Sequence, residues 1–313
     1  MIYDLHEDVA YHYFSGRRPD FDVDDGSRQS DLPKLKRAGV DLVFASIFPV
    51  ATTYGSTGPG GAAPAGAKSL ALEMFKMMYR LSERHGIAIV ERAADLDRGG
   101  LKFLLLMEGA DSLDDPSDLL LYFKLGLRAL GITWNLDNKF GASCLSRRDY
   151  GLTAYGEELV ALANRLGVIL DLTHASRRTA LDAISASRKP VVISHANAAS
   201  IHRSPRNIDD EVLEALKRNG GVIGVTAIPS LVGERGTVQE LVRHAVYIRE
   251  SFGADMLAVG TDALGVDRMV EGLESVDRLP AFLELLREAG FGDSEVEAVA
   301  YKNAKRVIEA NLS

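Results

Sequence analysis

The chain has 313 residues, of which 46% are hydrophobic and 26% charged, values typical of a globular protein with a sizeable core. Its 36 basic and 44 acidic residues give a net charge of −8, which argues against nucleic acid or an anionic membrane as partner. Cys144 is the only cysteine, so no intrachain disulfide is expected, and a zinc site would need histidine and carboxylate ligands. We find neither a basic leader with an apolar run nor a run near the ~18 residues of a membrane span, and expect a cytoplasmic location.

Short apolar segments rich in β-branched residues alternate with longer amphipathic segments along the chain. This alternation is typical of repeated β-α units around a parallel sheet. The apolar segments predict eight strands, at 2–8, 40–48, 102–109, 128–134, 168–175, 190–196, 221–228 and 256–263. Helical periodicity predicts helices that include 67–85, 154–166, 209–218, 238–252 and 294–310. Eight units without a linker predict an α/β fold of the (β/α)8 TIM-like barrel type, as a single domain over 1–313, with an open doubly wound sheet as the alternative.

One low-complexity segment, GSTGPGGAAPAG at 55–66, predicts a surface loop after the second strand. It overlaps GAAPAGAKS at 61–69, which differs from a phosphate-binding loop by one alanine inserted before Lys68. The preceding strand ends at residue 48, so the strand–loop–helix context that a nucleotide site requires is missing. We therefore expect no nucleotide site here.

Side chains that can bind a metal or transfer a proton lie at the ends of five predicted strands. They are His6 and Asp8, Glu108, His174, His195 and Asp262. The carboxyl ends of barrel strands converge on one mouth, where catalytic groups are found, so we expect these side chains to meet there. Taken singly, each has a structural alternative, such as a solvated acidic N-terminus, an ion pair or a hydrogen-bonded buried histidine.

The spacing of His6 and Asp8 would let both side chains bind the same metal ion. Residues two apart on a strand face the same way, so both side chains can reach one cation. By the same period Asp4 shares their face, deeper in the barrel, where we expect it to orient a ligand. Glu7 points the other way, and of these four residues of the first strand it is the one least expected to touch a metal.

An ordered set of motifs over nearly the whole chain resembles the membrane dipeptidase (renal dipeptidase) family of zinc peptidases, whose members are amidohydrolase-type barrels. The motifs, with the family pattern that each resembles, are DLHED at 4–8 (D-G-H-N-D), MEGAD at 107–111 (I-E-G-G), the stretch at 151–176 that ends in DLTHAS (G-L-T-x-x-G…N-x-x-G-x-x-x-D-x-S-H), VISHANA at 192–198 (S-H-S-N-A), the stretch at 205–225 that begins with PRNIDD (R-N-x-x-D…G-G-V) and VGTDALG at 259–265 (G-S-D-F-D-G). No single motif is specific, whereas the ordered set is.

The resemblance implies a binuclear zinc dipeptidase. Matching positions imply that His6 and Asp8 hold one zinc ion, that His174 and His195 hold the second, and that Glu108 bridges them. Histidine and carboxylate ligands suit zinc, and a carboxylate can bridge two such ions. A water between the ions would become the metal-bridging hydroxide that attacks the peptide bond. A homodimer is also what the resemblance suggests.

The resemblance also assigns roles to residues that handle the substrate. Asp262 would take the proton of the attacking water and deliver it to the leaving amine, which makes it a catalytic residue together with the bridging Glu108. Arg206 matches the family arginine that grips the free carboxylate of the dipeptide, a task that suits its bidentate fork.

Two departures from the family pattern bear on the substrate. Trp134, in GITWN, stands where the enzyme that names the family has a histidine that helps to stabilise the tetrahedral intermediate. Its indole N–H can donate a hydrogen bond but is neither a cation nor a base, and we expect Trp134 and Asn135 to contact the substrate. Leu264 replaces the second aspartate of its motif.

These departures leave two other functions open. A related metal-dependent amidohydrolase could act on another small amide or lactam. An inactive metal-binding barrel is disfavoured because Asp262 and Arg206 are both present beside the expected ligands.

Overall fold

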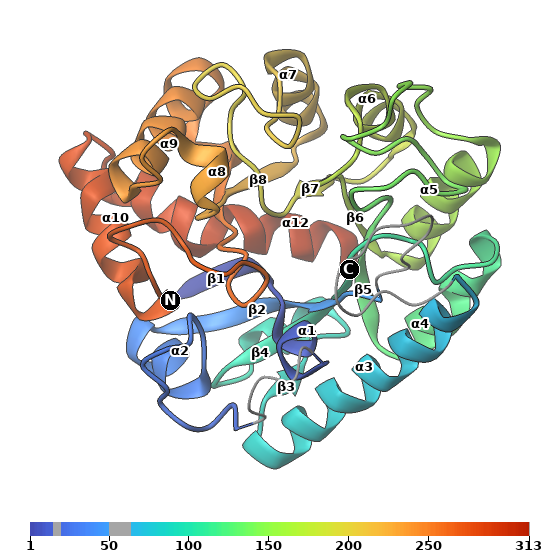
Figure 1. The fold of residues 1–313 in the computed structure, drawn as a ribbon, viewed down its shortest axis with the longest axis horizontal. Coiled ribbons are helices and arrows are strands. Elements are labelled where there is room, and N and C mark those ends of the chain that lie inside the picture. Colours follow the sequence, from blue (N-terminus) through green and yellow to red (C-terminus); the bar gives the residue numbers. More distant parts are fainter. Residues whose placement is uncertain (15–19, 50–63, 313) are drawn as a thin grey trace.

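The structure is a computed structural model and describes residues 1–14, 20–49 and 64–312. Eight parallel strands close into a barrel, because β2 pairs with both β1 and β4. Around the ring the strands are β1 (Ile2–Glu7), β2 (Val40–Ile47), β4 (Lys102–Met107), β5 (Leu127–Gly131), β6 (Ile169–Asp171), β7 (Val192–Ile193), β8 (Val222–Val225) and β9 (Leu257–Val259). Helices surround these strands (Figure 1). The predicted (β/α)8 barrel is confirmed, and the open doubly wound sheet is excluded.

The helices follow the strands in chain order. They are α1 (Val9–Phe14), α2 (Leu32–Ala38), α3 (Pro64–His85), α4 (Leu119–Lys124), α5 (Ala154–Leu166), α6 (Arg177–Ala186), α7 (Asp210–Asn219), α8 (Pro229–Val232), α9 (Val238–Phe252), α10 (Leu279–Glu288), α11 (Asp293–Glu297) and α12 (Asn303–Leu312). Their ends follow local sequence signals. The Thr153 hydroxyl accepts a hydrogen bond from the amide of Gly156 at the start of α5, and Gly167 ends this helix with a φ of 76°. Within the described ranges, no helix is long and apolar enough to cross a membrane.

Alternate residues of all eight barrel strands form one apolar cluster inside the barrel. Its strand members are Tyr3, Leu5, Leu42, Phe44, Leu104, Leu106, Ala129, Ile169, Val192, Val222 and Ala258. Ala304, Val307 and Ile308 of α12 join this cluster, so α12 closes one end of the barrel, which it crosses in Figure 1. The polar residues that follow the strands lie at the other end.

The observed elements differ from the predictions in several bounds. β5 to β9 end earlier than predicted. Beyond β6 and β9, His174 and Asp262 have positive φ angles that a strand cannot accommodate. The predicted helix at 294–310 is interrupted by a π-helical segment, Ala298–Lys302, which lets Val299 pack on the outer core while α12 packs into the barrel.

Two further segments differ from the predictions. A short strand, β3 (Ala88–Ile89), pairs with the first half of β4 and was not predicted. The predicted loop at 55–66 lies outside the described residues as far as residue 63, and α3 begins at Pro64, before the predicted start at 67.

Candidate metal centre

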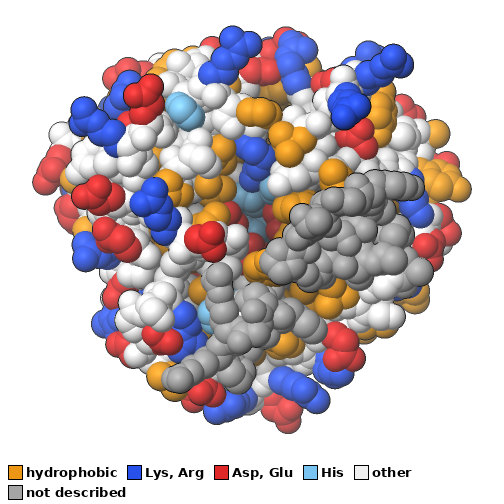
Figure 2. Space-filling model, in the orientation of Figure 1, with side chains coloured by type: hydrophobic (Ala, Val, Ile, Leu, Met, Phe, Trp, Pro, Cys, Tyr) orange, Lys and Arg blue, Asp and Glu red, His pale blue; other side chains and the backbone are white. Residues whose placement is uncertain are grey.

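The six side chains that were predicted to meet at the barrel mouth lie together there. Each is less than a tenth exposed, and together they are His6, Asp8, Glu108, His174, His195 and Asp262. Figure 2 views this face of the molecule and shows a hollow at its centre, with histidine and acidic side chains on the floor and a basic side chain at the edge. The strands therefore bring the predicted ligands into one buried cluster.

A bulge in β1 decides which of its side chains face the barrel. Tyr3 and Leu5 belong to the interior cluster, and the pairing of β1 with β2 shifts between Asp4 and Glu7. The bulge breaks the alternation of the strand, so His6 also reaches the interior. Asp4 was expected to orient a ligand, and its carboxylate accepts hydrogen bonds from the amide and hydroxyl of Thr261, at 2.8 and 2.6 Å, and from the backbone amide of the candidate ligand His6, at 3.3 Å.

The carboxylate of Glu108 faces a different ligand group with each oxygen. Its Oε2 lies 3.5 Å from Nε2 of His6, which in turn lies 3.7 Å from Oδ2 of Asp8. Its Oε1 lies 2.9 Å from Nε2 of His174 and 3.5 Å from Nε2 of His195. Two groups that contain Glu108, His6–Asp8–Glu108 and Glu108–His174–His195, each place three ligand atoms within 4.8 Å of one another, as does a third, His6–Asp171–His195. Glu108 is thus shared by two sets of ligands.

Hydrogen bonds fix which nitrogen of each second-group histidine faces the cluster. His174 uses Nδ1 to donate to the side-chain oxygen of Asn135, at 2.8 Å. His195 Nδ1 lies 2.9 Å from the Ser194 hydroxyl, which donates to Asp171 at 2.5 Å. Both Nε2 atoms are then left with a lone pair directed into the cluster, where they lie 3.2 Å apart.

These contacts show what the sequence missed. Asn135 was predicted to contact the substrate, and the structure places its carbonyl oxygen on a ligand histidine instead of leaving it free. Asp171 and Ser194 were not among the predicted site residues. Asp171 lies three residues before His174, in DLTH, and Ser194 lies directly before His195, in SH. A polar residue within three positions of a ligand histidine was the available signal.

The chemistry of this cluster fits metal ions. Two imidazole lone pairs 3.2 Å apart repel unless a cation lies between or beside them. Both ring nitrogens of His6 and Oδ1 of Asp8 are buried and have no hydrogen-bond partner among the residues that the structure describes. Buried polar atoms in such a state call for a ligand, and imidazole with carboxylate is a donor set that zinc prefers.

The protonation states of the Glu108–His174–His195 group point the same way, whereas for His6 burial is outweighed by Glu108 and Asp8, which raise its pKa well above the usual value in the metal-free chain. Burial lowers the pKa of His174 to about 3, and burial also holds the pKa of His195 well below its usual value, so both rings are neutral. For Glu108, burial opposes ionisation, but the neighbouring His6 and His174 hold the carboxyl pKa well below its usual range. Neutral imidazole and ionised carboxylate are the forms that bind metal.

Asp262 has a strained backbone and a carboxyl group whose pKa is raised. Its Oδ1 lies 3.7 Å from Nε2 of His6, and burial raises the pKa of the Asp262 carboxyl well above its usual value. Asp262 and His174 have φ angles of 61° and 66°, a region that non-glycine residues rarely adopt. Such strain persists only where surrounding contacts enforce it, and it is typical of functional sites.

Hydrogen bonds enforce both conformations. The carbonyl of His174 accepts from the amide of Cys144 at 2.7 Å and from the hydroxyl of Thr133 at 3.1 Å. The amide of Asp262 donates to the carbonyl of His6 at 3.1 Å. The first ligand strand and the acid/base candidate are therefore joined through the backbone.

Arg206 lies on the loop between β7 and α7 and directs its charge at the cluster. Its Nη1 is buried and has no hydrogen-bond partner within the described ranges. Burial is the main cause of the low pKa of His174 and His195, and the positive charge of the Arg206 guanidinium lowers the pKa of both further. It is therefore placed to bind an anionic group held over the metal ligands.

An aromatic row lies at the mouth, beyond the strands β1, β2 and β5. The ring of Trp134 lies 6.0 Å from that of His174 and 5.0 Å from that of Phe48, which is 5.6 Å from Tyr11. Gly109, with a φ of 80°, makes room for this row, because a Cβ there would lie 3.1 Å from the amide nitrogen of Trp134. Trp134 therefore borders the ligand cluster beyond the end of β5.

Comparison with known proteins agrees with the geometry of this site. The family model of membrane dipeptidase, peptidase family M19, matches residues 1–312. Dipeptidase tcpJ of Claviceps purpurea is 29% identical over 308 residues, which cover 92% of this chain and 72% of that protein. Dipeptidase 3 of Rattus norvegicus is 32% identical over 255 residues, which cover 77% of this chain and 52% of that protein.

Solved structures share the fold over its full extent. The crystal structure of dipeptidase AC, a metallopeptidase of family M19, has a TM-score of 0.88 at 25% identity and covers 99% of this chain and 98% of its own. A metallopeptidase from Rhodobacter sphaeroides, bound to a phosphinate mimic of the dipeptide L-Ala-D-Ala, has a TM-score of 0.89 at 24% identity and covers 99% of both chains. The chain belongs to the membrane dipeptidase family, the metallopeptidase family M19, as its motifs predict.

Proposed function

We propose that this M19 dipeptidase is a binuclear zinc enzyme that hydrolyses the peptide bond of dipeptides. The single observation that carries the proposal is the position of Glu108, whose two carboxylate oxygens face His6 on one side and His174 with His195 on the other. In this arrangement His6 and Asp8 hold one ion, His174 and His195 hold the other, and Glu108 touches both.

The bound zinc ions supply Lewis acidity and an activated water, and the chain supplies the remaining groups. Asp262 takes a proton on its carboxylate at the start of the reaction and gives it to the leaving amine at the end. Its Oδ1 stands 3.7 Å from a ligand nitrogen, so it is within reach of groups bound over the cluster. Burial keeps its pKa high, which suits a group that must hold a proton during turnover.

Arg206 and the aromatic row suggest how a dipeptide lies. Arg206 binds the free carboxylate, so the second residue of the substrate stays near β7. The first residue then points toward the aromatic row, and Trp134 packs against its side chain. A substrate with an apolar first residue is the class that this arrangement favours. This requirement for a carboxylate one residue beyond the scissile bond limits the enzyme to short substrates.

A panel of dipeptides tests the proposed function. The purified protein should hydrolyse dipeptides with L and D residues at the second position, lose activity on chelation and regain it with zinc. Metal binding without hydrolysis of any dipeptide would favour the inactive barrel, and hydrolysis of small amides or lactams alone would favour the related amidohydrolase. A cytoplasmic location, a homodimer and a single domain over 1–313 stay predictions from the sequence.

A further inference from the structure

We propose that Gln29 is a positioning residue that fixes the loop on which Asp262 lies. The inference rests on the proposed role of Asp262 in proton transfer. Gln29 lies in the segment between α1 and α2 and is only 8% exposed. No sequence motif draws attention to it, and its importance comes from its two hydrogen bonds to a segment more than two hundred residues away.

The loop after β9 has an unfavourable backbone. Asp262 and Leu264 have φ angles of 61° and 71°, both in the left-handed region. Gly265 turns so tightly over the site that a Cβ there would lie 2.1 Å from Oδ2 of Asp8 and 2.7 Å from Oδ1 of Asp262. A loop this close to two site carboxylates cannot shift without moving them or losing contact with them.

The amide of Gln29 binds this loop at two points. Its Oε1 accepts from the amide of Leu264 at 2.6 Å, and its Nε2 donates to the carbonyl of Val266 at 2.8 Å. The pair requires a group that accepts and donates at once, as a side-chain amide does. A glutamate in this place would keep only the acceptor, and a methionine neither.

Gln29 is itself held in place. Its carbonyl accepts from the amide of Val276 at 2.9 Å. The preceding residue, Arg28, donates from its guanidinium to the carbonyls of Asp20 and Val23, at 2.8 and 2.7 Å. The segment therefore presents the amide of Gln29 from a fixed backbone.

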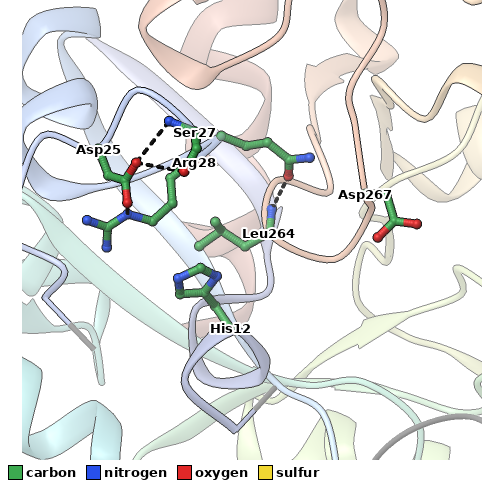
Figure 3. A pocket seen from close by; sticks show the side chains of 7 residues that line it. His12, Asp25, Ser27, Arg28, Leu264 and Asp267 are labelled. Carbon is green, nitrogen blue, oxygen red and sulfur yellow. Dashed lines mark hydrogen bonds and ion pairs between the residues drawn. The ribbon is translucent and has the colours of Figure 1, made fainter. Parts of the chain in front are cut away.

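Gln29 and Leu264 border the same cavity. Leu264 lines this cavity of about 570 Å³ together with His12, Asp25 and Asp267. Figure 3 shows the Leu264 side chain above His12, with its amide bonded on the far side. The two hydrogen bonds of Gln29 tie the left-handed turn to the segment between α1 and α2, in addition to the bonds from the amide of Asp262 to His6 and from the amide of Gly265 to Asp262.

Two variants and a matched control test the clamp, by which we mean the two hydrogen bonds from the side chain of Gln29 to Leu264 and Val266. Gln29→Met keeps the length of the side chain and removes both hydrogen bonds, and Gln29→Glu keeps the acceptor. Gln239→Met, on the exposed side of α9, is the control. With a dipeptide substrate, Gln29→Met should lower kcat roughly 10- to 100-fold while KM and zinc content stay near those of the wild type. The kcat of Gln29→Glu should lie between those of Gln29→Met and the wild type, and the kcat of the control should equal that of the wild type.

Hydrogen exchange of the same zinc-loaded proteins gives a readout that needs no turnover. The amides of Asp262 and Gly265, which Gln29 does not touch, donate to the carbonyls of His6 and Asp262. In Gln29→Met both should exchange ~10-fold faster, because the whole loop loosens.

Three results decide between the proposals. An unchanged kcat in folded Gln29→Met, or faster exchange at Leu264 alone, would overturn the clamp. If Gln29→Met does not fold, Gln29→Glu must show the lowered kcat and the faster exchange. A wild type that hydrolyses no dipeptide would count against the proposed function, and the exchange data would still decide on the clamp.

Discussion

Oε1 of Glu108 lies 2.9 Å from Nε2 of His174, while the second oxygen of the same carboxylate lies 3.5 Å from Nε2 of His6. Strand β4 delivers this carboxylate because Leu104, Leu106 and Glu108 alternate onto the same face. A carboxylate that is shared in this way is costly to bury unless cations lie on both sides. The predictions below follow from this arrangement.

Glu108→Gln should weaken both zinc sites together. The amide has one weak donor oxygen in place of a charged carboxylate, so neither ligand group keeps its anionic member from β4. We expect the affinity of both sites to fall at least ~10-fold, measured by zinc titration against a competing chelator. Glu157→Gln, on the exposed surface of α5, is the control. Loss of one site with the other intact would contradict a shared carboxylate.

Asp262→Asn should keep the metal and lose the rate. The amide preserves the shape of the side chain but cannot take up a proton, so we expect kcat to fall at least ~100-fold at unchanged zinc content. Steady-state kinetics and metal analysis on one sample check this. Full activity in the variant would show that another group transfers the proton.

Arg206→Ala should act on the binding of the substrate carboxylate. Nη1 of Arg206 is buried and has no hydrogen-bond partner among the described residues, so the substitution breaks no described hydrogen bond of this atom. We expect KM for free dipeptides to rise roughly 10- to 100-fold, the value of a hydrogen bond to a charged group, with little change for C-terminally amidated dipeptides. The exposed Arg203 provides the control in Arg203→Ala. An equal effect on both substrate types would refute the assignment.

Trp134→Ala should change the preference for the first residue of the substrate. Loss of the indole removes the apolar surface beside His174, so we expect the ratio of kcat/KM for L-Phe-L-Ala to that for L-Ala-L-Ala to fall ~10-fold. Trp134→Phe should retain most of the preference. A ratio that stays constant across these variants would place the first side chain elsewhere.

His244 should make stability depend on pH. Its Nδ1 accepts from the amide of Ala198 at 3.2 Å and its Nε2 donates to the carbonyl of Val232 at 3.0 Å, so the buried ring is neutral. Burial lowers the pKa of His244 to about 4, whereas the unfolded chain protonates this residue near its ordinary value of ~6.5. The unfolded state therefore binds the extra proton first, and stability is lost as the pH falls from 6.5 toward 4.

The His244→Gln variant isolates this effect. Between pH 7.5 and 4.5, the free energy of unfolding should fall less in the variant than in the wild type, by roughly 2–3 kcal/mol. Urea unfolding of the two metal-free proteins at several pH values measures the difference. Parallel curves would show that His244 does not titrate on unfolding.

The sequence predicted the barrel, and the meeting of the candidate ligands at its mouth, because both depend on local patterns. Strand period and parallel pairing place Glu108, His174 and His195 at one mouth irrespective of details. The side-chain directions of β1 could not be predicted in this way, since one bulge between Asp4 and Glu7 reverses the faces of the strand. A register shift of this kind depends on the partner strand and leaves no mark in the sequence.

Other parts of the site depend on contacts between distant segments. Gln29 and Leu264 meet across the fold, and no spacing in the chain connects them. The positive φ of His174 is likewise set by Cys144 and Thr133 from neighbouring loops. Residues that act through such tertiary hydrogen bonds become visible only in the structure.

Zinc titration of the metal-free enzyme tests the central claim, two ions held around Glu108, most directly. Chelated protein is loaded with increasing zinc, and hydrolysis of one good dipeptide substrate is measured at each step. The account predicts that activity rises until two equivalents per chain are bound and then stays constant. A plateau at one equivalent, or full activity in protein shown to be free of metal, would contradict it.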